Sequence, residues 1–162
     1  MSHVTSRTIT AAIVLFALAH TPAFAAVVVI DQKIALAGKV TAGDGAGFPV
    51  TISEPGSYRL NSNLVVTDPS VTVIEITADN VTLDLGGFSV IGPNACTRTP
   101  VQCTIQGASG IGIKAVSTTG LSPANVRVTN GVVKGMGGHG IRMMGDDTVV
   151  ERVHATENGG PG

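Results

Sequence analysis

The sequence predicts an all-β fold in which short parallel strands stack into a solenoid of about four to five coils. The first observation is a repeated glycine pattern: SGIGIK at 109–114 resembles GHGIR at 138–142, and GPG at 160–162 begins the pattern again. The step from Gly140 to Gly162 is 22 residues, and the step from Gly112 to Gly140 is 28 because it includes the turn-rich segment TTGLSPA. Such periods are typical of solenoids, in which each coil buries its apolar face against its neighbours.

The second observation is a strand pattern that runs in phase with the first. NVTLDL at 80–85 is echoed by NVRVTN at 125–130 and by DTVV at 147–150. Asn125 to Asp147 is again 22 residues, whereas Asn80 to Asn125 is 45 residues. We interpret the longer step as about two periods, with a cysteine-containing loop inside it.

Alternation along these segments predicts which side chains face the core. Residues 57–66 and 71–77 also alternate and are rich in β-branched side chains, so they are predicted strands as well. Because successive side chains of a strand point to opposite faces, one set is predicted to face inward: Val81, Leu83, Leu85, Val126 and Val128. The intervening set is predicted to face outward: Thr82, Asp84, Arg127 and Thr129.

Glycine, proline and asparagine are expected at the corners of the coils. The chain has 21 glycines and 8 prolines spread throughout and no sustained helical period, which argues against a helical fold. Asn130 and Asn158 each precede a glycine, so we expect both in left-handed corner positions, hydrogen-bonded to neighbouring coils.

The first 25 residues have the pattern of a signal peptide. A weakly basic start at 1–7 precedes an apolar run at 9–19 and the sequence AFA at 23–25, which predicts cleavage near Ala25. The apolar run is too short to span a bilayer, so no membrane span is expected after cleavage. We therefore expect a secreted or periplasmic protein, with residues 26–50 as an amino-terminal cap or lead-in and residues 51–162 as the coils.

Cys96 and Cys103 are the only cysteines, and both lie in the polar loop at 93–108. In an oxidising compartment this spacing favours a local disulfide over a redox or metal site, so we predict that the two are bonded. We predict no metal ligand set and no evident cofactor.

Charge and aromatic content exclude some partners. Without Arg7 the exported chain has nine basic residues against 11 acidic ones, so no polybasic surface for nucleic acid is expected. Only Phe48, Tyr58 and Phe88 remain as aromatic residues, which offers little for stacking on sugar rings. The composition does not determine the oligomeric state.

A family resemblance follows from these motifs. PGSYRLNSNLVV and IEITADNVTLDLGGFSVIG, followed by VRVTNGVVKGMGGHGIRM and ENGGPG, resemble secreted bacterial right-handed parallel β-helix proteins of the pectate-lyase-like superfamily. The resemblance covers roughly residues 50–162 and implies a right-handed parallel β-helix. It also implies polysaccharide chemistry of the lyase, hydrolase or epimerase type.

The candidate catalytic residues are His139, Arg142, Asp146 and Asp147. Polygalacturonase-like members use aspartates with a Gly-His-Gly, but there the aspartates precede the histidine, and here they follow it. A lyase-like activity would need calcium and a base, for which Asp84, Asp146, Asp147 and Glu151 could supply oxygens, and Arg127, Lys134 and Arg142 the positive charge. We favour turn chemistry for the aspartates, and a variable solvent-facing corner for His139, whose place is taken by Ile111 and Pro161 in other repeats.

Two functions from different classes remain open. Lys114 and Arg142 align in successive repeats and predict a two-step basic ladder on one face, which would suit an anionic polysaccharide. The alternative is a non-catalytic surface or periplasmic scaffold or adhesive protein. Because the glycine pattern begins again at Gly160, we also expect the native protein to extend beyond Gly162, which an intact-mass measurement would test.

Overall fold

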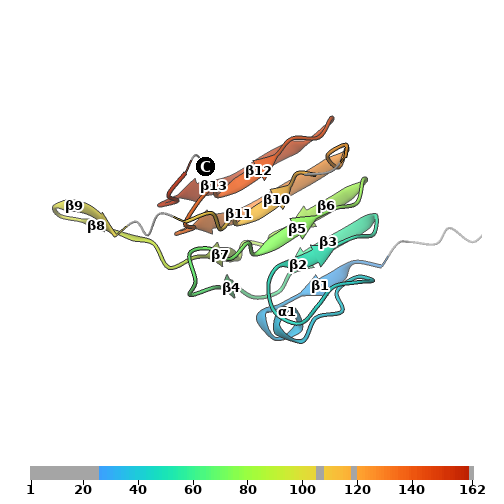
Figure 1. The fold of residues 1–162 in the computed structure, drawn as a ribbon, viewed down its shortest axis with the longest axis horizontal. Coiled ribbons are helices and arrows are strands. Elements are labelled where there is room, and N and C mark those ends of the chain that lie inside the picture. The colour runs from blue at the N-terminus through green and yellow to red at the C-terminus, as the bar shows by residue number, and fades with distance from the viewer. Residues whose placement is uncertain (1–25, 105–107, 118–119, 161–162) are drawn as a thin grey trace, which may run out of the picture.

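The protein is a parallel β-solenoid of about five turns with almost no helix, as the sequence predicts. The structure is a computed structural model that describes residues 26–104, 108–117 and 120–160. The predicted signal peptide and Pro161 lie outside these residues. Figure 1 shows the strands stacked in chain order, from β1 at one end to β12 and β13 at the other.

Three columns of parallel strands form the walls of the solenoid. The sheet here called sheet B contains β2 (Val50–Ile52), β5 (Ile74–Ile76), β10 (Ile113–Ala115) and β12 (Ile141–Met143). The sheet called sheet A has two columns, of which the first contains β1 (Val28–Ile30), β3 (Gly56–Leu60) and β6 (Val81–Asp84), and the second β4 (Leu64–Val65) and β7 (Ser89–Ile91). The long strands β11 (Val126–Lys134) and β13 (Val149–Thr156) pass through both columns of sheet A.

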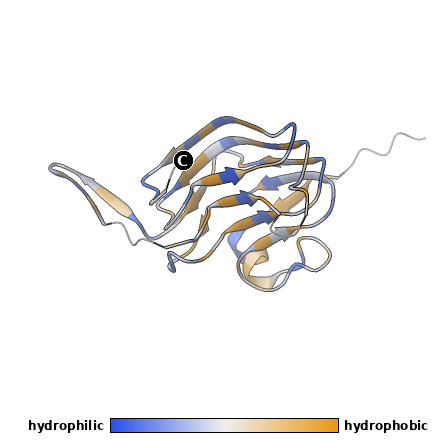
Figure 2. Cartoon of the chain, turned by 45° about the horizontal axis from the view of Figure 1, so that its top comes forward, coloured by the Kyte–Doolittle hydropathy of each residue, from blue (hydrophilic) through white to orange (hydrophobic). Residues whose placement is uncertain are grey.

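The alternation predicted for the inward side chains is confirmed. The side chains of Val81, Leu83, Leu85, Val126 and Val128 are all buried in one continuous core. Leu83 pairs in register with Tyr58 on the coil before and with Val128 on the coil after, so like positions stack directly on each other. Apolar and polar segments accordingly alternate along the stacked strands (Figure 2).

The outward set is confirmed except for Thr129. Thr82 and Arg127 are exposed and Asp84 is partly exposed, whereas Thr129 is only 5% exposed. Thr129 lies in register between Asp84 and Glu151, and these two longer side chains flank its short one on both sides. Burial of a short outward residue therefore depends on its neighbours in the adjacent coils, which the sequence of one strand does not contain.

The interpretation of the 45-residue step as two periods is wrong. Val126 pairs directly with Val81, so the segment from Asn80 to Asn125 is a single coil. Its extra length lies outside the paired strands of the wall, in the segment that contains the cysteine hairpin and in the segment between Ala115 and Val126. Loops of this kind lengthen a coil without disturbing the register of the strands on either side.

The predicted disulfide is confirmed. Cys96 and Cys103 are bonded across an antiparallel hairpin of β8 (Ala95–Arg98) and β9 (Val101–Thr104), in which they are register partners. Figure 1 shows this hairpin projecting away from the stacked coils.

One short helix departs from the expectation of a chain without helix. Helix α1 (Gln32–Ala37) begins at Asp31, whose side chain accepts a hydrogen bond from the Ile34 amide at 2.7 Å. It ends at Gly38, which has a φ of 75° and donates its N–H to the Ile34 carbonyl. No helix among the described residues is long and apolar enough to cross a membrane.

Side chains from residues 26–50 form hydrogen bonds with the backbone of the neighbouring edge strands. The Gln32 amide group accepts from the Val65 N–H at 2.8 Å and donates to the Val65 carbonyl at 3.2 Å, as a neighbouring strand would. Asp44 accepts from the Thr51 and Val40 amides at 2.7 and 2.9 Å. Because unpaired strand edges invite further pairing, these bonds protect β4 and β2.

We predict that Asp44→Ala lowers the free energy of unfolding by about 2 kcal/mol, because two backbone donors lose their acceptor. Asp44 is itself buried, so water replaces the carboxylate poorly. Urea denaturation followed by circular dichroism measures the change. Asp146→Ala is the control, since this exposed side chain accepts no hydrogen bond among the described residues, and an equal loss in both variants would contradict the prediction.

Candidate functional site

The predicted basic ladder exists as a register but carries mixed charge. Lys114 on β10 pairs with Arg142 on β12 and with Glu75 on β5, and Glu75 pairs with Thr51 on β2. We call these four outward residues the sheet B row. The Lys114 Nζ lies 2.7 Å from the Glu75 Oε1, and both side chains are about three-quarters buried. Lys114 is therefore neutralised locally, and Arg142 is the exposed cation of the row.

A shallow groove runs beside the sheet B row. It has a volume of about 210 Å³ and is lined by the ends of β5 and by the loop that follows β10, including Glu75, Thr77, Ser117 and Pro123. A second groove of about 200 Å³ continues past this loop toward Asp79 and Asp146. Together they place hydroxyl and carboxylate oxygens beside the charged row.

Two of the candidate catalytic residues, His139 and Asp146, are not brought together. His139 precedes β12 and Asp146 follows it, and an extended strand rises about 3.3 Å per residue, so the two lie at opposite ends of the strand. Asp147 has a φ of 53° and aligns with Asn80 and Asn125, whose φ values are 57° and 52°. This left-handed geometry is what turn chemistry requires of the position.

The corner of His139 is more enclosed than the sequence predicts. Ile111, its counterpart one coil earlier, is only 7% exposed, and His139 is half-buried. The reason is the close stacking of the glycine-rich strands, in which the Gly112 amide donates to the His139 carbonyl at 3.1 Å. The slot is therefore a contact between coils and not a solvent-facing corner.

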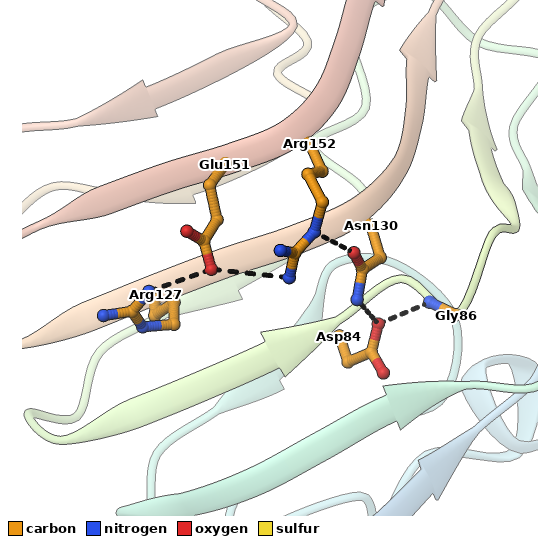
Figure 3. A network of polar contacts seen from close by, with 6 residues as sticks. All are labelled: Asp84, Gly86, Arg127, Asn130, Glu151 and Arg152. Atoms are coloured by element: carbon orange, nitrogen blue, oxygen red, sulfur yellow. Dashed lines mark hydrogen bonds and ion pairs between the residues drawn. The ribbon is translucent and has the colours of Figure 1, made fainter.

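A polar network crosses three coils on the outer face of sheet A (Figure 3). The Asn130 amide donates to the Asp84 carboxylate at 3.0 Å and accepts from the Arg152 Nε at 2.7 Å. Next to it the Arg127 guanidinium lies 2.9 Å from the Glu151 carboxylate. We call these five residues the sheet A network. It brings together Asp84, Arg127 and Glu151 of the set considered for lyase-like chemistry, but not Lys134, which lies in the second column.

The pKa of Asp84 lies below its usual value. A hydrogen bond from the Gly86 backbone N–H, at 2.9 Å, lowers the pKa of Asp84, and the Asn130 amide and the charges of Arg59 and Arg152 lower it further. Partial burial opposes these effects. The carboxylate is thus held ionised, which suits a structural anchor more than an acid. Among the described residues no group of three or more His, Cys, Asp or Glu side chains is arranged to hold a metal ion.

The left-handed corners are only partly as predicted. Asn130 has a φ of 59° and bonds to both neighbouring coils, which confirms the prediction for this residue. Asn158 also bonds to the preceding coil, through the Met136 N–H at 3.0 Å, but the left-handed residue there is Glu157. The shift by one residue places the Asn158 amide beside the backbone of the coil before it.

Several residues of these surfaces were missed from the sequence. Glu75 could have been found, because IEI at 74–76, IKA at 113–115 and IRM at 141–143 share an apolar–charged–apolar pattern. Arg152 carries no such signal, since its partners depend on a corner whose other members are Asn130 and glycine. No sequence pattern indicated a surface role for Arg59 or Phe88 either.

We predict that Asn130→Ala is less stable than Asn130→Gly by about 1 kcal/mol. Both variants lose the bonds to Asp84 and Arg152, but only glycine adopts the left-handed conformation without steric cost. Urea denaturation of both variants measures the difference. At Asn158, which lacks a positive φ, glycine should bring no such advantage over alanine, and equal behaviour at the two positions would contradict the interpretation.

We also predict that Asp84 contributes a pH-dependent part of the stability. Its pKa is lower in the folded than in the unfolded chain, so its contribution is present above the unfolded value of about 3.9 and is lost as the pH falls through the folded pKa. The difference in unfolding free energy between the native chain and Asp84→Asn should therefore shrink from pH 7 to pH 3. Urea titrations at several pH values test this, and a difference independent of pH would exclude the effect.

Comparison with protein-family models, with curated proteins and with solved structures found no significant match to this chain. The fold is therefore established by the strand topology and register described above. The resemblance to pectate-lyase-like proteins is carried by the sequence motifs, and what it implies for function is a proposal.

Proposed function

We propose that this chain is an exported protein that binds an acidic polysaccharide along the sheet B row. The observation that carries the proposal is the register that stacks Glu75, Lys114 and Arg142 on consecutive strands. Neighbouring strands lie about 4.8 Å apart, so the row offers charged groups at regular short steps to a polymer running along the solenoid. Export is supported by the signal-peptide pattern and by the Cys96–Cys103 disulfide, a bond typical of oxidising compartments.

The charges of the row favour carboxylate ligands over neutral ones. Arg142 is exposed, and among the described residues its guanidinium has one hydrogen-bond partner, the Met144 sulfur at 3.9 Å, and no ion pair. A guanidinium presents a planar fork of donors that matches a carboxylate. Lys114 can share its three donors between Glu75 and a ligand, so binding does not require that the ion pair break.

Processing of the bound polymer, of the lyase, hydrolase or epimerase type, is the extension of this proposal that the family resemblance implies. It would need an acid and a base near one sugar unit. The pair His139 and Asp146 is separated by β12, so the geometry supports binding more directly than cleavage.

A non-catalytic scaffold that binds another protein is the second candidate. Leu121 is 98% exposed on the loop after β10, and Met144 is 63% exposed across the adjacent groove. Exposed apolar side chains that lie together are more typical of protein interfaces than of polysaccharide sites.

The test is binding of the purified protein to polygalacturonate, with the double variant Lys114→Gln, Arg142→Gln. We expect at least tenfold weaker binding by this variant, because two cations are lost and Glu75 is left unpaired against an anionic polymer. Binding should also weaken with rising salt, since exposed charges are screened. Lys33→Gln, which removes an exposed cation without a partner among the described residues, is the control.

Two results decide between the alternatives. Absence of binding to polygalacturonate, or binding that is equally strong in the double variant, would refute the proposal and leave the scaffold function. Release of new reducing ends or unsaturated ends from the polymer, measured with and without calcium, would extend binding to processing.

A further inference from the structure

A separate groove lies on the other wall of the solenoid, on the outer face of sheet A. Its volume is about 400 Å³, and it is lined by Val29, Arg59, Leu60, Asn61 and Phe88. This volume is within the range of small-molecule sites, which begins at roughly 300 Å³. The groove shares no residue with the sheet B row or with the two grooves beside it.

Arg59 supplies an available cation to this groove. It stands in register between Val29 and Asp84, and its side chain is 59% exposed. Its only hydrogen bond or ion pair among the described side chains is a long one, 3.6 Å from Nε to the Asp84 Oδ2. Asp84 is already held by the Gly86 amide and by Asn130. The two terminal amino groups of Arg59 are thus able to receive a carboxylate as a bidentate pair.

Phe88 is partly buried against the core, and it also lines the groove beside this cation. A Cβ on Gly86 would lie 3.3 Å from the Arg59 Nε and 3.5 Å from the Phe88 Cδ2, so the guanidinium and the ring flank the same glycine. Gly86 has a φ of 60°, and the same Cβ would lie 2.8 Å from the Leu60 carbonyl oxygen. Glycine at this turn therefore keeps the corner open and lets the cation and the ring approach each other.

The other two aromatic residues of the described chain lack this arrangement. Tyr58 is buried in the core. Phe48 lines a different groove, with Gln32 and Asp68 among its polar residues and no cation. Phe88 is the described aromatic that borders a groove together with a basic side chain.

We propose that this groove binds a single uronate unit, a sugar ring that carries a carboxylate. Arg59 receives the carboxylate, Phe88 packs against the apolar C–H face of the ring, and the exposed amide of Asn61 is available to the hydroxyl groups. A neutral sugar would leave Arg59 unused, and a simple carboxylate would leave Phe88 unused, so the pair selects for a ligand with both features. The choice of a uronate as the ligand rests on the proposed function, whereas the existence of the groove does not depend on it.

The experiment is a titration of the full exported chain with a trimer of galacturonic acid, and separately with a neutral galactose trimer. NMR of the Phe88 ring reports contact at this groove. We expect the acidic trimer to shift the Phe88 signals, and Arg59→Gln to weaken the binding that these signals report at least tenfold. In the Lys114→Gln, Arg142→Gln background, which removes the cations of the sheet B row, Phe88→Leu should weaken the remaining binding at least tenfold. The matched controls are Lys33→Gln for the charge and Phe48→Leu for the ring, and neither should change the affinity.

Each other result overturns the inference. Unchanged binding of the acidic trimer in Arg59→Gln would do so, as would equal binding of the neutral trimer. If Phe88→Leu does not fold, Arg59→Gln and the Phe88 signals still decide. Loss of polygalacturonate binding in the Lys114 and Arg142 double variant, with no effect of Arg59→Gln on either ligand, would leave the proposed function standing and this groove without a role.

Discussion

The parallel register between coils is the constraint on which the rest of the molecule depends. Val81 on Val126, and Leu83 between Tyr58 and Val128, put each inward position directly above its counterpart. A one-residue slip of any strand would turn its apolar set to solvent and its polar set to the core. The interior is therefore restricted to side chains such as valine, leucine and isoleucine, while the exterior is free to vary.

This division explains how much of the molecule could be predicted from its sequence. The inward residues, the all-β class and the disulfide were predictable, because alternation and cysteine spacing are local signals. The length of the coil between Asn80 and Asn125 was not, since two loops add residues without adding a turn. Thr129 was misplaced for a related reason: its burial is set by Asp84 and Glu151, which belong to other coils.

The interactions of the outward side chains were even harder to predict from the sequence, because they join residues that are distant in the chain. The Lys114 ammonium meets a carboxylate 39 residues away, and Asn130 meets one 46 residues away. No motif of a single strand contains such a pair. His139 and Asp146, which were catalytic candidates because of their side-chain types, are close in the chain but are held apart by β12.

The corners connect the buried register with the chemistry of the surface. A corner residue must adopt the backbone conformation of the turn, and its side chain also projects to the surface. At one corner, successive coils carry Gly86, Asn130 and Arg152, all with a positive φ. Glycine accepts this conformation freely, asparagine tolerates it, and arginine adopts it at a cost of about 1 to 2 kcal/mol. The bonds from Arg152 to Asn130 and Glu151 offset part of that cost. The strained backbone at Arg152 and the open groove near Gly86 thus lie at the same corner on different coils. Both follow from one requirement, that every coil turns at the same place.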